Sequence, residues 1–190
     1  MVDSQVKGVW FASAHNFLVD ELGDERLDAV VRAMAPAHRE ALSRPIAYDW
    51  YPEPALQDML NALFEVECGN DQIYFEDLMR RCTRTGVSRF FRVLVSLGSF
   101  RFVTSKVPVM WGRIRRGAGE VDVEFLSNPE RARVSYRDFP WFSDPLYRLM
   151  TRGSLAGVVE LCIGHTPELT EVETGSDRFV VDIASHEATA

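Results

Sequence analysis

The stretch "EVDVEFLSNPERARVSYRDF", residues 120–139, decides the fold class of this chain. In its first six residues Val121, Val123 and Phe125 alternate with acidic side chains, which is the pattern of a strand with one face toward water. The run "RARVSYRDF" can pair with it across a turn at Asn128-Pro129. The stretch therefore predicts an antiparallel hairpin.

Upstream of this hairpin the pattern is mostly helical. Apolar residues in Leu56–Phe64 recur at spacings of three and four and form one stripe. Gly69-Asn70 predicts the end of that helix, and Asp71 predicts the start of the next one. A further, separate helix capped by Ser88 is expected over 89–97.

Two other N-terminal segments predict different structures. The run "VKGVWFA", Val6–Ala12, is short, apolar and aromatic, and predicts an opening strand. The segment "SRPIAYDWYPEP", Ser43–Pro54, contains three prolines and predicts an ordered connector without a regular element.

The C-terminal third adds one helix and a second hairpin. Asp144-Pro145 is typical of a helix start, and the apolar pattern runs to about Cys162. The stretch "VETGSDRFVVDI", residues 172–183, predicts a closing hairpin whose core residues are Val172, Phe179, Val181 and Ile183. Together the patterns predict an α+β fold, with helices through the first two thirds packed on a small antiparallel sheet. We expect a single domain over 1–190, with its core at about 6–184.

Composition narrows the class of protein. The net charge of −7 argues against a general nucleic-acid partner. No apolar run approaches the roughly 20 residues of a membrane span, and the N-terminus lacks a signal-peptide pattern, so we expect a cytoplasmic protein. Three scattered cysteines, Cys68, Cys82 and Cys162, indicate reduced thiols and not a disulfide framework.

The stretch 78–119 contains no acidic residue and ten basic ones. In one interpretation Arg113, Arg115 and Arg116 form a basic surface that contacts an anion or an acidic partner. In the other, favoured for most of the arginines, they pair with acidic helices of the same molecule, such as the one with residues 20–28. The sequence does not decide whether this stretch is exposed or paired internally.

Motifs for catalysis or metal binding are weak. The four histidines, His15, His38, His165 and His186, lack the spacing of a metal site. Gly153 and Gly157 lie four apart on one helix face, which predicts close packing against the sheet or, less favoured, a bound ligand.

Carboxylates in the proline-rich connectors have two interpretations. Asp49, Glu53, Asp138 and Asp144 could serve as general acids or bases. Helix capping is the favoured interpretation for Glu53 and Asp144, which stand where caps are expected.

Three segments carry a resemblance to a known family. "KGVWFASAHNFL", "YDWYPEPALQDMLNAL" and "GSLAGVVELCIG" together resemble the myxobacterial Mxa paralog family, a domain of unknown function, from about Lys7 to Ile183. More distantly, the late helix and hairpin are similar to vinyl-reductase-like, haem-nitric-oxide-binding-related and TRAPP-subunit-like domains.

The sites of that wider group are not carried over to this chain. Its terminal hairpin often has a cysteine in each strand, and "ELTEVETGSDRFVVDI" has none. Its haem branch needs an axial histidine in a helix and a Tyr-x-Ser-x-Arg motif, and the nearest stretch here, "VSYRDF", lacks that pattern. We therefore expect no cofactor and no metal.

The leading hypothesis is a non-enzymatic regulatory or sensory domain. It binds a small apolar or amphipathic molecule, or a protein partner, in a pocket between the late helix and the sheet. The residues expected to line or shape this pocket are Trp50, Tyr51, Trp111, Trp141 and Gly157. The alternatives are a homodimerising scaffold without ligand and, least favoured, an enzyme with an aspartate or glutamate base.

Overall fold

The structure is a computed structural model that describes residues 4–96, 98–127 and 130–185, with the side chains of 87–97 outside this description. Its first part is mainly helical. The elements are β1 (Gln5–Lys7), α1 (Val9–Leu22), α2 (Asp24–Ala33), α3 (Arg39–Ser43), β2 (Trp50–Pro52) and α4 (Glu53–Ala62), which continues into a π-helical turn at Leu63–Glu67.

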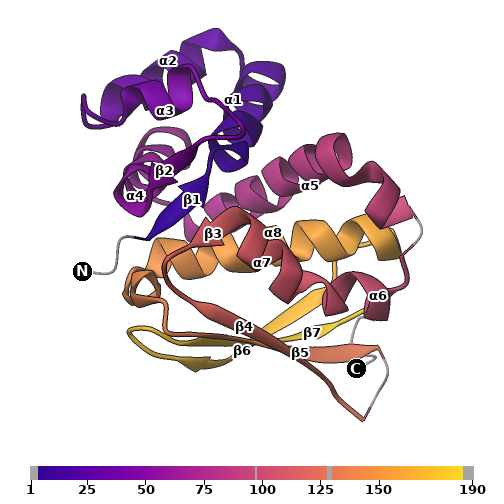
Figure 1. Cartoon of the computed structure of the whole chain (residues 1–190). Coiled ribbons are helices and arrows are strands. Elements are labelled where there is room, and N and C mark those ends of the chain that lie inside the picture. Colours follow the sequence, from indigo (N-terminus) through magenta and orange to yellow (C-terminus); the bar gives the residue numbers. More distant parts are fainter. Residues whose placement is uncertain (1–3, 97, 128–129, 186–190) are drawn as a thin grey trace.

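The second part contains the long helices and the main sheet. The elements are α5 (Gln72–Ser96), α6 (Phe100–Ser105), α7 (Val107–Ile114), β3 (Arg115–Arg116), β4 (Glu120–Phe125), β5 (Arg131–Arg137), a 3-10 turn at Pro140–Ser143, α8 (Pro145–Ile163), β6 (Glu168–Thr174) and β7 (Phe179–Ala184). Helices α5 and α8 lie side by side above the sheet, and α1–α4 form a separate helical layer (Figure 1).

The described strands form two antiparallel sheets, which confirms the predicted α+β fold. The larger has the order β4-β5-β7-β6, and the smaller has the order β2-β1-β3. In the larger sheet Val134 pairs with Val123 on one side and with Val181 on the other. Val134, Phe179, Val181 and Ile183 are fully or almost fully buried, so the predicted alternation does place one face of this sheet in the core.

The predicted boundaries hold where a cap or a left-handed residue defines them. Gly69 and Asn70 have φ of 55° and 66°, which ends the helical path before α5. The carboxylate of Asp71 accepts from Ile73 N at 2.8 Å, and that of Asp144 accepts from Leu146 N at 2.9 Å. The proposed turn at Asn128-Pro129 lies outside the described residues.

Four sequence predictions were wrong in extent. The opening strand ends at Lys7 and α1 begins at Val9, because β1 pairs over only three residues on each side. Within the predicted connector, Trp50–Pro52 forms strand β2 against β1. Helix α5 continues without a break through 89–97 to Ser96, so no separate helix begins after Ser88, whose side chain lies outside the described part. Val172 is 45% exposed and does not belong to the core, and it lies where the pairing of β6 shifts between Glu171 and Glu173.

Candidate ligand pocket

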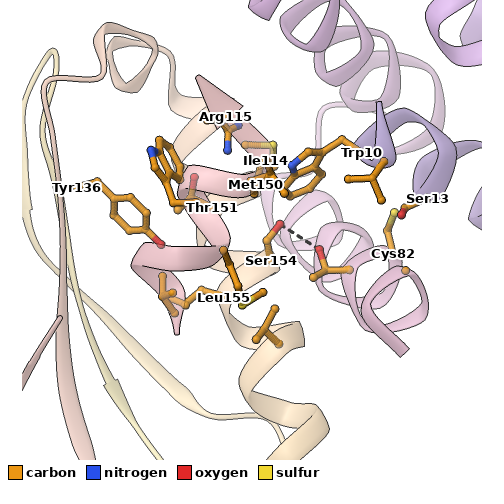
Figure 2. A pocket seen from close by; sticks show the side chains of 17 residues that line it. Trp10, Ser13, Cys82, Ile114, Arg115, Tyr136, Met150, Thr151, Ser154 and Leu155 are labelled. Carbon is orange, nitrogen blue, oxygen red and sulfur yellow. Dashed lines mark hydrogen bonds between the residues drawn. The ribbon is translucent and has the colours of Figure 1, made fainter. Parts of the chain in front are cut away.

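A pocket of about 120 Å³ lies where α1, α5, α7 and α8 meet, and Tyr136 borders it from β5 at the left of the view (Figure 2). Most of its lining is apolar: Val9, Trp10, Val107, Met110, Trp111, Ile114, Met150, Leu155 and Val158. The polar residues in its lining are Ser13, Cys82, Thr83, Arg115, Tyr136, Thr151 and Ser154. An apolar cavity with a few polar groups is the usual form of a small-molecule site.

Small residues let the helices approach closely beside this pocket. A Cβ on Gly157 would lie 2.5 Å from the carbonyl oxygen of Arg80, and one on Gly153 would meet the backbone of Glu76. Both glycines therefore pack against the backbone of α5. The predicted close packing is present, but its partner is α5 and neither the sheet nor a ligand.

Trp111 on α7 forms the wall of the pocket next to the sheet. Its ring centroid lies 5.3 Å from that of Tyr136 and 5.1 Å from that of Phe139. Its indole nitrogen donates to the carbonyl oxygen of Gly119 at 3.2 Å. Gly119 has φ of 88°, and a Cβ there would meet Trp111 at 3.0 Å, so the glycine makes room for the indole.

A buried ion pair lies at the edge of the pocket. Nε of Arg115 donates to Oε1 of Glu53 at 2.9 Å, and both side chains are almost completely buried. The hydroxyl of Tyr147 donates to Oε2 of the same carboxylate at 2.9 Å. Glu53 was expected to cap α4, but its carboxylate instead neutralises Arg115.

The guanidinium of Arg115 is incompletely satisfied. Its Nη2 is buried and has no hydrogen-bond partner. Its Cζ lies 4.4 Å from the ring centroid of Trp111 and 5.8 Å from that of Trp10, both of which line the pocket. In Figure 2 Arg115 lies between Trp10 on one side and Tyr136 on the other. The pocket thus contains one cationic donor against an apolar wall.

Burial moves the pKa values of one thiol and two phenol groups around the pocket further above neutral pH. Burial raises the pKa of the Cys82 thiol to about 12, against a smaller opposing effect of Arg81. Burial also raises the pKa of Tyr136, with Arg115 opposing it. The pKa of Tyr147 is raised by burial and then by Glu53. Cys82 is therefore a thiol and not a reactive thiolate.

Two hydroxyls in the pocket already have partners. Thr83 on α5 donates to Ser154 on α8 at 3.1 Å, which links the two helices across the pocket wall (Figure 2). Thr151 donates to the carbonyl oxygen of Tyr147 at 2.7 Å, within α8. These hydroxyls need no ligand to be satisfied, unlike Nη2 of Arg115.

Of the five residues expected to line a pocket, the structure places only Trp111 in the lining of this one. Trp50 lies on β2 between Lys7 and Arg116, Tyr51 packs on Phe11, and Trp141 stacks on Tyr147. Gly157 packs on α5. Their role in ligand binding stays a prediction, and the structure does not bring the five residues together.

The three arginines of the predicted basic surface also have separate environments. Arg113 is exposed, Arg115 is buried in its ion pair, and Arg116 donates to Gln5 at 2.6 Å. Elsewhere in the basic stretch, Arg80 and Arg84 pair with Glu160 on α8. Internal pairing is therefore the observed outcome for several of the arginines, with Glu53, Asp77 and Glu160 as partners.

Sequence reasoning missed Trp10, Tyr136 and the exceptional place of Arg115 in the pocket. Trp10 was assigned to a strand, so its position on one face of a helix was not considered. Tyr136 follows Val134 at a spacing of two in β5, so the alternation of this strand predicts that both side chains face the core. The alternation does not show that the side chain of Tyr136 borders a cavity.

Comparisons with known proteins support the fold. No family model and no curated protein matches the chain. Several solved structures do match, and H-NOX proteins are among them. A variant of the T. tengcongensis protein has a TM-score of 0.66 at 15% identity and covers 94% of this chain and 96% of its own. The unliganded Fe(II) H-NOX protein of K. algicida has a TM-score of 0.66 at 13% identity, and the match covers 97% of this chain and 98% of that protein.

A third match, the S. oneidensis H-NOX protein in its Fe(II)NO state, has a TM-score of 0.65 at 14% identity and covers 93% and 97% of the two chains. These likenesses show that the chain has the H-NOX fold. One of the three distant relatives expected from the sequence is thus a structural neighbour, whereas nothing found here matches the myxobacterial family.

The residues of the pocket do not fit a histidine-ligated haem. No histidine lines it in the part of the chain that the structure describes. His15 is hydrogen-bonded to the carbonyl oxygen of Leu42, and His38 is hydrogen-bonded to the carboxylate of Asp58. His165 is hydrogen-bonded to the carbonyl oxygen of Ser185, and His186 lies outside the described residues. The pocket lining contains one thiol, Cys82, and its raised pKa disfavours the thiolate form that would ligate iron. A cavity of about 120 Å³ is also comparable to one that binds benzene, far smaller than a porphyrin.

Two further properties of the described residues concern metal binding and helix hydropathy. These residues contain no cluster of three or more histidine, cysteine or acidic side chains able to hold a metal ion. Within the same ranges, no helix has the length and hydropathy needed to cross a bilayer.

Proposed function

We propose that this chain is a sensory domain that uses the H-NOX fold to bind a small apolar or amphipathic molecule in place of haem. The observation that carries the proposal is the pocket beside Trp10 and Trp111, apolar on most of its lining and provided with one unpaired donor. Its volume is of the order of a cavity that takes up benzene.

Three findings support binding over catalysis. No aspartate or glutamate lines the pocket in the described part of the chain, so a carboxylate base is missing there. The thiol of Cys82 and the hydroxyl of Tyr136 both have raised pKa values, which leaves each of them a poor nucleophile. Glu76, whose pKa burial raises, contacts Arg152 and lies outside the pocket lining.

The proposed description also includes a single domain, a cytoplasmic location and membership of the Mxa paralog family. Sequence patterns support these three parts. In this proposal, ligand binding changes how the chain contacts a protein partner or a second copy of itself.

The test uses benzene as a probe and the indole NMR signals of the uniformly ¹⁵N-labelled protein. Trp10 and Trp111 line the pocket, whereas Trp50 and Trp141 do not, so binding should shift the first two indole signals and leave the others in place. Absence of any saturable shift of the Trp10 and Trp111 signals would refute the proposed pocket function.

A matched pair of variants separates pocket binding from surface binding. Ser154→Leu fills the pocket from α8 and should abolish the shifts. Ser105→Leu adds the same side chain at an exposed helical serine outside the pocket and should preserve them. Purification from haem-supplied cells should give no Soret band, and a stoichiometric Soret band would overturn the haem-free part of the proposal.

A further inference from the structure

The unpaired guanidinium nitrogen defines what the ligand of the pocket must carry. Arg115 is only 4% exposed, and its Nη2 is buried without a partner, although Nε is fully engaged with Glu53. A buried donor without a partner destabilises the folded protein, and more so when it is charged. No open space adjoins this nitrogen, so a ligand in the pocket reaches it when the side chain of Arg115 turns toward the pocket, and an acceptor on the ligand then gives it the partner that it lacks.

The acceptor should be neutral. Arg115 is the only cationic side chain in the described pocket lining, and its charge is already balanced by Glu53 at 2.9 Å. A carboxylate ligand would therefore bring a second negative charge next to a buried carboxylate, which is unfavourable in an apolar surrounding. A carbonyl or ether oxygen satisfies Nη2 without adding charge.

The rest of the molecule should be apolar and compact. The other hydroxyls that face each other in the pocket, those of Thr83 and Ser154, are already bonded to one another. The opposite walls are formed by Trp10, Trp111 and Leu155. A cavity of about 120 Å³ accepts one ring and leaves no room for a long chain.

We propose that the pocket selects a small neutral carbonyl or ether compound, with Nη2 of Arg115 as the donor to its oxygen. This inference rests on the proposed function, because it assumes that the pocket opens to a ligand. The inference goes beyond the proposed function because it assigns the class of ligand and the residue that recognises the ligand.

The test compares two probes of similar shape, cyclohexanone and methylcyclohexane. Because the two probes differ strongly in hydrophobicity, their Kd values are not compared with each other. For each probe, the Kd for the wild type is compared with the Kd for the variant. In the double variant Glu53→Gln/Arg115→Met, the donor and its counter-charge are removed together, which avoids an unpaired buried carboxylate. We expect the Kd of cyclohexanone to rise about tenfold or more and that of methylcyclohexane to change by less than about threefold.

Tyr136→Phe is the matched control. It removes the other donor on the Trp111 side of the pocket while keeping the ring and the Arg115–Glu53 pair. The preference for cyclohexanone should persist in this variant. If it disappears here and survives in the double variant, Tyr136 is the donor and the assignment to Arg115 is wrong.

A measurement on the unchanged protein covers the case in which the double variant does not fold. The guanidinium NMR signals of Arg115 should shift with cyclohexanone and not with methylcyclohexane. Tighter binding of cyclohexanecarboxylate than of cyclohexanone would overturn the neutral-ligand inference. Benzene binding with no such discrimination sinks this inference and leaves the proposed function standing, whereas failure of benzene itself removes the proposed function.

Discussion

Helix α8 contacts its neighbour α5 in two different ways. On one side Gly153 and Gly157 lie directly against the backbone of α5, with no space for even a methyl group. On the other side Thr151, Ser154 and Leu155 border the pocket together with Cys82 of α5. The same pair of helices is therefore closely packed along one line and leaves a cavity beside it.

The difference shows how a cavity can persist next to a dense contact. The glycines bring the backbones together and fix the distance between the helices. Beyond this line the facing residues Thr83 and Ser154 are small and hydrogen-bonded to each other, so they do not fill the space below α7. Close packing on one side thus holds the pocket open on the other.

The largest expected effect breaks the packed side. Gly157→Ala places a Cβ 2.5 Å from the carbonyl oxygen of Arg80, and because that atom belongs to a helix backbone, the helices must move apart. We expect the free energy of unfolding to fall by about 2 kcal/mol. Urea denaturation measures it.

Gly112→Ala is the control for this change. Gly112 is an exposed glycine in α7 with nothing within 4 Å of its added Cβ, so alanine should raise the free energy of unfolding by about 0.4–1 kcal/mol. Equal effects at the two glycines would contradict the close-packing account.

The second prediction concerns the open side of the α5–α8 contact, where Cys82 lines the pocket. Because burial raises the pKa of Cys82 from 9.0 to about 12, the unfolded chain loses this thiol proton at a lower pH than the folded one. Its contribution to stability is therefore complete below about pH 9 and is lost as the pH rises toward 12, by at most about 1.4 kcal/mol per pH unit.

The measurement is the stability difference between the wild type and Cys82→Ser as a function of pH. Serine does not titrate in this range, so the difference should shift in favour of the variant as the pH rises from about 8.5, below the pKa of 9.0 in the unfolded chain, to about 10.5, between that value and the folded pKa of about 12. Cys162→Ser should show a weaker dependence, because Cys162 is only half buried. A difference that stays constant across this range would show that water reaches Cys82.

The sequence predicted the elements of the fold better than their partners. The alternation in 120–125 and the cap at Asp144 depend on near neighbours, and both are correct in the structure. The glycine pair on α8 also correctly predicted close packing. It could not identify α5 as the partner, because an absent side chain makes room without specifying what enters it.

The candidate site was harder to predict. Arg115 and Glu53 are 62 residues apart, and neither the basic stretch nor the proline-rich connector indicates that they meet. Trp10 lies in α1, which begins directly after Gly8, and it lines the pocket from that helix and not from a strand. Such sites depend on how the elements pack, and periodicity does not report it.

The smallest expected effect sharpens the open side of the comparison. Ser154→Leu adds about two side-chain heavy atoms, and because Ser154 lines the pocket, the leucine side chain should extend into it. The lost hydrogen bond from Thr83 costs about 1 kcal/mol, and the newly buried carbons offset it, so the free energy of unfolding should change by less than about 1 kcal/mol. A leucine at position 154 should then be tolerated better than a single methyl group at Gly157, although both residues belong to α8. Thermal and urea unfolding of the two variants under identical conditions measure this difference. If Ser154→Leu lowered the free energy of unfolding as much as Gly157→Ala, there would be no usable space beside α8.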